Sequence, residues 1–217
     1  MAFHVIFDMD GVILDTERMY LNAWRKVAQE NGLGDLDALI YRCIGLNERR
    51  TKELVTSYLG PERNYDTLRA QVKDAFNRQA KETGIPVKKG VYEIFPYLSS
   101  RKITMGLASS TRGERVIPQL TDAKLLSYFS AVVTGDMVRY SKPEPEIFLL
   151  CAEQMGVSPA DTYVIEDSFN GITAAHRAGM MPIMVPDLIQ PTDEIRQMAE
   201  TVCSDLFGVI DYLRSLH

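Results

Sequence analysis

The chain has 217 residues, of which 46% are hydrophobic and 24% are charged, and its formal net charge at pH 7 is −5. This composition is that of a globular protein, and the length allows one α/β domain with a small insert but not two large domains. The negative charge argues against general binding to nucleic acid or anionic membranes, and no apolar run approaches the roughly 20 residues of a membrane-spanning helix. With no N-terminal secretory signal, we expect a cytoplasmic protein.

The first predicted strand is HVIFD, residues 4–8, and it leads into two aspartates, Asp8 and Asp10, with Gly11 directly behind them. Two carboxylates so close together repel one another, and little water screens them at the end of a buried strand. Either something else offsets this repulsion or the segment is only an exposed turn. The apolar run that enters Asp8 directly favours the first interpretation.

A long stretch after this strand, residues 16–84, shows helical spacing and contains no convincing strand. Trp24 and Val27 fall on one helix face, and Val55 and Tyr58 fall on another. Turn signals rich in glycine and proline separate the helical stretches. This pattern predicts a helical insert directly after the first strand.

Beyond residue 101, apolar runs alternate with helical stretches, which is typical of a parallel sheet with crossover helices. The four further predicted strands are residues 102–109, 131–135, 162–167 and 181–185. A continuous apolar run such as Tyr163-Val164-Ile165 is expected for a strand covered on both faces.

These patterns predict an α/β fold, with a Rossmann-like parallel-sheet core and a small inserted α-helical domain. We expect the core to comprise residues 1–15 and 86–217 and the insert to comprise residues 16–85.

Polar residues close four of the five predicted strands. In chain order they are Asp8, Asp10, Ser109, Lys142, Glu166 and Asp167. Because ligands bind outside the carboxyl ends of the strands in an open parallel sheet, we expect these side chains to form one site. Clustered carboxylates are costly without a counter-ion, whereas Mg²⁺ would offset their repulsion and attract phosphate. The pattern therefore predicts metal-assisted phosphoryl transfer.

Four segments resemble, in order, the four motifs of the haloacid dehalogenase superfamily, and the resemblance covers essentially the whole chain. They are DMDGV at 8–12, LASS at 107–110, SKPEPEIF at 141–148 and VIEDSFNGITAAHRAGM at 164–180. The helical insert after the first motif is similar to that of members with a small helical cap. These members include β-phosphoglucomutases and sugar-phosphate phosphatases.

The resemblance implies a catalytic role for four of these residues. Asp8 would be the nucleophile and would form an aspartyl-phosphate. Asp10 would protonate the leaving group and then take a proton from water. Ser109 would donate a hydrogen bond to a phosphate oxygen, and Lys142 would neutralise charge in the transition state.

The resemblance also implies a Mg²⁺ site. Asp8, the backbone carbonyl of Asp10 and Asp167 would hold the ion, with Glu166 as a further ligand or as an anchor behind it. Gly11 would let the backbone approach the phosphate closely.

Several of these positions also have purely structural interpretations. Ser109 or Ser110 could cap the helix that follows, and we expect Ser110 or Thr111 to do so. Glu166 and Asp167 could cap the helix after the fourth motif. The apolar strand that runs into both acids favours metal binding instead.

Substrate choice is expected to depend on the insert, which would close over the site. We assign substrate binding to Gly11, Ser110, Tyr20 and Arg49. By position, Tyr20 and Glu48 replace the cap histidine and the phosphate-binding cap arginine of the mutase pattern. Without that arginine, a second phosphate would be bound weakly unless Arg49 or Arg50, which lie next in sequence, substitutes.

We therefore predict a Mg²⁺-dependent phosphatase for a small phosphorylated metabolite, most simply a sugar phosphate. The alternatives are a β-phosphoglucomutase-type mutase and, in another class, a non-catalytic phosphometabolite sensor. We expect a monomer or a small homo-oligomer with no nucleic-acid or membrane partner.

Overall fold

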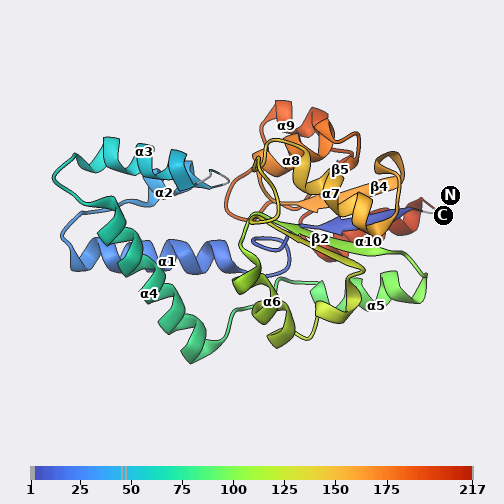
Figure 1. Cartoon of the computed structure of the whole chain (residues 1–217), viewed down its shortest axis with the longest axis horizontal. Coiled ribbons are helices and arrows are strands. Elements are labelled where there is room, and N and C mark those ends of the chain that lie inside the picture. The colour runs from blue at the N-terminus through green and yellow to red at the C-terminus, as the bar shows by residue number, and fades with distance from the viewer. Residues whose placement is uncertain (1–2, 45, 47, 217) are drawn as a thin grey trace. The chain divides into compact units, whose positions relative to one another are not determined.

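The chain divides into two compact units. The computed structural model describes residues 3–44, 46 and 48–216. The core unit comprises Met1–Leu14 and Val87–His217, and the helical unit comprises Asp15–Pro86. The core unit contains the sheet, and the helical unit contains the first four helices (Figure 1).

The core unit is built on a six-stranded, wholly parallel sheet with the strand order β3-β2-β1-β4-β5-β6. The strands are β1 (His4–Phe7), β2 (Met105–Ser109), β3 (Ala131–Thr134), β4 (Thr162–Glu166), β5 (Met181–Met184) and β6 (Thr201–Val202). All five predicted strands are confirmed. The sequence patterns missed β6, because two edge residues are too short a run to show a period. The order reverses between β1 and β4, which is where open α/β sheets bind ligands.

Helices cover both faces of this sheet. They are α5 (Val91–Ser100), α6 (Gly113–Asp122), α7 (Glu146–Met155), α8 (Phe169–Arg177), α9 (Asp193–Met198) and α10 (Leu206–Ser215). Successive residues of β1 point to opposite faces. Ile6 belongs to a buried cluster with Phe148 of α7 and Ala174 of α8. Phe7 contacts Phe95 of α5, with the ring centroids 4.9 Å apart. Thus α7 and α8 lie on one face and α5 and α10 on the other (Figure 1), as the continuous apolar strands predict.

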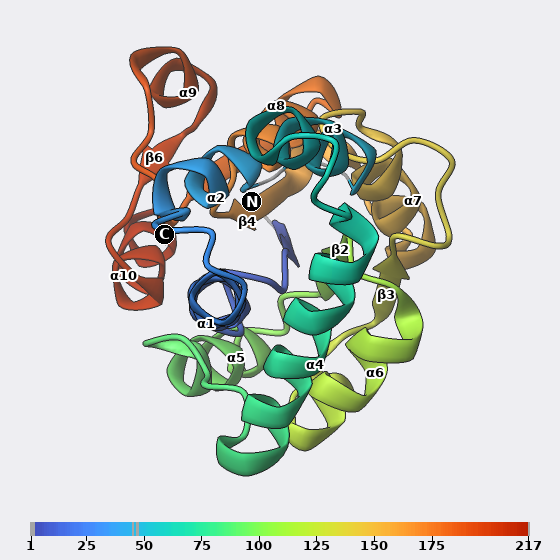
Figure 2. The same cartoon turned by 90° about the vertical axis from the view of Figure 1, so that its left-hand side faces the viewer.

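The helical unit contains α1 (Thr16–Glu30), α2 (Asp37–Cys43), α3 (Glu48–Leu59) and α4 (Tyr65–Thr83). Figure 2 shows α1 end-on with α4 beside it. The predicted apolar face of α1 is buried, with Trp24 5% and Val27 1% exposed. The predicted face of α3 is only partly correct, because Val55 is buried whereas Tyr58 is 59% exposed.

Candidate active site

Four charged side chains are buried together at the carboxyl ends of the central strands. Asp8 directly follows β1, Glu166 ends β4, and Asp167 comes next, while Lys142 lies in the loop between β3 and α7. Taken as whole residues, none of the four is more than 7% exposed. Burying charges is costly unless they are paired, so this arrangement must be held by specific contacts.

Lys142 supplies these contacts by joining three strand ends. Its Nζ donates to Asp8 Oδ1 at 2.5 Å, to the Ala108 carbonyl of β2 at 3.1 Å and to Glu166 Oε1 at 2.8 Å. The other oxygen of Glu166, Oε2, accepts from the Ser168 amide at 2.6 Å. Both oxygens of Glu166 are therefore hydrogen-bonded within the protein, and one of them orients the lysine.

Lys142 and Asp8 change each other's pKa, and more carboxylates than ammonium groups surround them. Burial alone would lower the pKa of Lys142, but Asp8 and Glu166 outweigh it and raise the pKa, so the ammonium form persists. Burial raises the pKa of Asp8 well above its ordinary value; Lys142 opposes this effect, while Glu166 and Asp10 add to it. A single ammonium thus does not balance the carboxylates grouped around it.

Three of the carboxylates could hold a metal ion. Asp8, Glu166 and Asp167 each offer an oxygen, and these oxygens lie within 4.8 Å of one another. Gly11 borders this cluster with φ +78°, a conformation that favours glycine. A Cβ atom at Gly11 would overlap the carboxylate of Asp167. The backbone therefore approaches the acidic cluster in a way that no larger residue would allow.

Asp10 reaches a different set of partners. Its Oδ2 accepts hydrogen bonds from the hydroxyls of Ser109, at 3.3 Å, and Thr111, at 2.8 Å. Asp8 pairs instead with Lys142. The two aspartates of the first motif are thus held by different groups, although they are only two residues apart.

Thr111 lies beside the site, although its position in the sequence favours a helix-capping role. Ser110 or Thr111 was expected to cap the next helix, and this prediction is wrong. The helix α6 begins at Gly113, whose amide donates to Asp136 Oδ1 at 2.9 Å. The hydroxyl of Thr111 donates to Asp10 instead. The only signal for this role in the sequence is a second hydroxyl residue two positions beyond Ser109.

The predicted substrate-binding residues lie in different settings. Ser110 is exposed in the core unit. In the helical unit, the Tyr20 ring stacks on Phe76, with the centroids 4.3 Å apart, and the Arg69 guanidinium lies 5.3 Å from the Tyr20 centroid. Tyr20 is therefore part of the packing between α1 and α4. Its role in binding stays a prediction.

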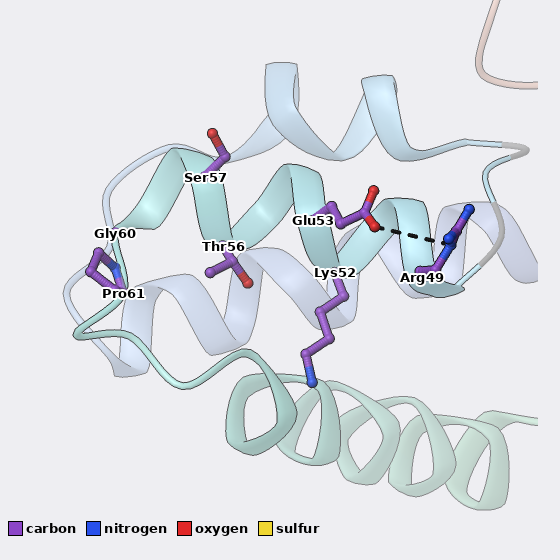
Figure 3. Close-up of a pocket in the computed structure, with 7 residues that line it drawn as sticks. All are labelled: Arg49, Lys52, Glu53, Thr56, Ser57, Gly60 and Pro61. Carbon is purple, nitrogen blue, oxygen red and sulfur yellow. Dashed lines mark ion pairs between the residues drawn. The ribbon is translucent and has the colours of Figure 1, made fainter.

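Arg49 lies on the surface of α3, where its side chain is 80% exposed and its Nε is 4.0 Å from Glu53 Oε1. It lines a groove of about 600 Å³ along α3 (Figure 3). The lining residues are Arg49, Lys52, Glu53, Thr56, Ser57, Gly60 and Pro61. Figure 3 shows Lys52 directed away from Arg49 toward α4, where it pairs with Asp66. Substrate binding by Arg49 likewise stays a prediction.

No helix in residues 3–44, 46 and 48–216 is both long and apolar enough to cross a membrane.

The family follows from comparison with known proteins. Residues 5–185 match the model of the haloacid dehalogenase-like hydrolases. The chain belongs to this family. The resemblance predicted from the four motifs is therefore confirmed, and so is the α/β fold with its parallel sheet.

Relatives of this hydrolase include two named phosphatases. A phosphorylated carbohydrates phosphatase of Thermotoga maritima is 35% identical over 176 residues, which cover 81% of each chain. The fructose-1-phosphate phosphatase YqaB of Escherichia coli is 37% identical over 182 residues, covering 81% of this chain and 92% of that protein. These names support the predicted class, a phosphoric monoester hydrolase.

A solved structure matches this hydrolase along its whole length. It is a Thermotoga maritima protein assigned as a β-phosphoglucomutase, 30% identical, with a TM-score of 0.81 and coverage of 100% of both chains. The fold is thus shared by phosphatases and by a protein assigned as a mutase.

Proposed function

We propose that this hydrolase is a Mg²⁺-dependent phosphatase that acts on a small phosphorylated carbohydrate through an aspartyl-phosphate on Asp8. The observation that carries the proposal is the buried contact of Asp8 with Lys142 beside Glu166 and Asp167. The names of the two phosphatase relatives support the substrate class. A phosphometabolite sensor would have no need of both a nucleophile and a separate acid.

The first step is attack on phosphorus by a carboxylate oxygen of Asp8. A bond forms between Asp8 and phosphorus, and the bond from phosphorus to the sugar oxygen breaks. Lys142, held as an ammonium by two carboxylates, stabilises the negative charge that develops on the phosphoryl oxygens. The hydroxyl of Ser109 donates a hydrogen bond to one of these oxygens, and Asp10 gives a proton to the departing sugar oxygen.

In the second step Asp10 takes a proton from water, which attacks the phosphorus and releases inorganic phosphate and free Asp8. The hydroxyls of Ser109 and Thr111 hold the carboxylate of Asp10 in place for both proton transfers.

The donor set fits Mg²⁺. Asp8, Glu166 and Asp167 supply hard carboxylate oxygens in one cluster, and the backbone carbonyl of Asp10 would add a fourth. The acidic excess that raises the pKa of Asp8 favours a bound cation. When bound, Mg²⁺ would neutralise this excess and attract the phosphate group.

The helical unit, predicted as residues 16–85, is proposed to be the cap that selects the sugar, while the core, predicted as residues 1–15 and 86–217, carries the chemistry. Tyr20 and Arg49 would contact the substrate from the cap, with Gly11 and Ser110 binding it from the core. This division of roles lets one chemistry serve different sugars.

The test is phosphate release from a panel of sugar phosphates and p-nitrophenyl phosphate, with and without Mg²⁺. We expect Asp8→Asn to lower phosphate release by at least about 10³-fold, because an amide is a poor nucleophile. Asp211→Asn is the matched control, since Asp211 is an exposed residue of α10 paired with Arg214, and its activity should equal that of the wild type. Full activity of Asp8→Asn, or full activity after chelation of Mg²⁺, would contradict the proposal.

A mutase is the second candidate, favoured by the full-length match to the protein assigned as a β-phosphoglucomutase. β-Glucose 1-phosphate with a bisphosphate primer separates the two functions. A phosphatase releases inorganic phosphate in proportion to the substrate consumed. Stoichiometric glucose 6-phosphate with little free phosphate would establish the mutase instead.

A further inference from the structure

Two hydroxyl groups converge on one oxygen of Asp10. Thr111 Oγ1 donates to Asp10 Oδ2 at 2.8 Å, and Ser109 Oγ donates to the same oxygen at 3.3 Å. The shorter contact lies near the optimum for a hydrogen bond between a hydroxyl and a carboxylate, and the longer one lies beyond it. Thr111 is thus the stronger partner of the two.

The backbone around Thr111 is fixed from both sides. Its amide donates to Ser109 Oγ at 3.0 Å, and its carbonyl accepts from the Gly135 amide, just beyond β3, at 3.0 Å. A Cβ atom at Gly135 would overlap the carbonyl of Ser110, so the two loops lie in close contact. These contacts fix the backbone from which the hydroxyl of Thr111 donates to Asp10.

Each hydroxyl has one hydrogen, so it donates one strong hydrogen bond at a time. In the proposed function Ser109 donates to a phosphate oxygen, and it must then give up its long contact with Asp10. Thr111 carries no such second task. We propose that Thr111 is a positioning residue, which holds Asp10 in the orientation that transfers a proton to the leaving group; this inference rests on the proposed function.

The contact also bears on the proton that Asp10 transfers in the proposed function. When Asp8 bonds to phosphorus and the bond to the sugar oxygen breaks, this proton moves to that oxygen and yields a neutral hydroxyl. Asp10 is then an anion, and the hydrogen bond from Thr111 becomes charge-assisted and stronger. The contact is therefore worth more after proton transfer than before it.

The experiment compares substrates whose leaving groups differ in their need for a proton. 2,4-Dinitrophenolate leaves without protonation, whereas a sugar alkoxide does not. For Thr111→Val we expect kcat/KM for the best sugar phosphate of the panel to fall about 10- to 100-fold. For 2,4-dinitrophenyl phosphate the value should change less than about 3-fold, since general acid catalysis contributes little there. The parameter kcat/KM is used because it reports the step that releases the sugar.

Two further variants test whether the hydroxyl of Thr111 itself is responsible. Thr111→Ser keeps the hydroxyl and should restore the sugar phosphate activity to within about 3-fold of the wild type. Thr121→Val removes an exposed hydroxyl of α6 that donates to the Ile117 carbonyl, and both activities should be unchanged.

Equal losses on both substrates would overturn the inference, because a contact with phosphate or a general disturbance of the loop lowers both alike. Retained sugar phosphate activity in Thr111→Val would also overturn it. These failures differ from that of the proposed function, in which the wild-type protein itself would hydrolyse neither substrate.

Discussion

Each unit contains a lysine that pairs with a carboxylate, but the two lysines lie in opposite surroundings. In the core unit, Lys142 pairs with Asp8 and Glu166, and the three side chains are 6%, 8% and 2% exposed. In the helical unit, Lys52 pairs with Asp66, and these side chains are 50% and 70% exposed. Both lysines make short contacts with carboxylates, so distance alone does not separate them.

The two pairs differ in the free energy that is lost when one charged residue of the pair is removed. An exposed ion that loses its partner is solvated by water, whereas a buried ion is not. In the core unit, water cannot replace a lost partner of Lys142, Asp8 or Glu166. Buried charges of this kind are found preferentially at functional sites. Burial of a whole charged cluster, rather than the presence of ion pairs, therefore distinguishes the candidate active site from the rest of the described chain.

Removing each lysine gives the largest expected difference. Lys142→Ala should destabilise the protein by about 3–5 kcal/mol, because it leaves two buried carboxylates unpaired. Lys52→Ala, the matched change at the surface, should cost less than about 1 kcal/mol. Urea unfolding followed by circular dichroism measures both. Similar values for the two variants would break the comparison.

A smaller effect is expected from crowding the carboxylate that orients Lys142. Gly171 lies in the first turn of α8, and a Cβ atom there would overlap the side chain of Glu166. We expect Gly171→Ala to cost about 1–3 kcal/mol and to lower phosphatase activity, since Glu166 must move.

Gly208→Ala is the control for this substitution, because Gly208 is also in the first turn of a helix, and the nearest atom to its added Cβ would be Cys203 Cβ at 3.2 Å. Its stability should change by less than about 1 kcal/mol. If Gly171→Ala kept full activity and stability, the packing around Glu166 would be looser than the contacts indicate.

The strand ends could be predicted from the sequence because each signal is local. An apolar run that stops at a charged residue is visible at Asp8 and again at Glu166, and parallel topology brings such ends to one edge. The family resemblance then assigned their roles. The same local reasoning found the helices of the insert and placed Trp24 on a buried face.

The contacts of the loops could not be predicted, because they join residues that are distant in sequence. Thr111 meets Asp10 across 101 positions, and the Gly113 amide donates to Asp136 in the loop after β3. A serine or threonine before a helix has a local capping role available, and propensity favours that role. Only the three-dimensional course of the loop after β2 reverses the assignment.

The smallest expected effect comes from an ion pair of the core unit that is only partly buried, with the Lys89 side chain 74% and the Asp205 side chain 18% exposed. Asp205 caps α10 by accepting from the Gly208 amide at 3.1 Å, and it also pairs with Lys89. Asp205→Ala should cost about 1 kcal/mol through loss of the cap. Asp205→Asn keeps a capping side chain and removes the charge, so it should cost only a few tenths of a kcal/mol.

The contribution of the Asp205 charge to folding stability depends on pH. The hydrogen bond from Lys89, followed by that from the Gly208 amide, lowers the pKa of Asp205 in the folded state. Its contribution is therefore complete above the unfolded-state pKa of about 3.9 and is lost as the pH falls through the lower folded-state value. The stability difference between wild type and Asp205→Asn should shrink over that acid range in urea titrations. A cost for Asp205→Asn as large as that for Lys142→Ala would mean that membership of the core unit, rather than burial, decides what a charge contributes.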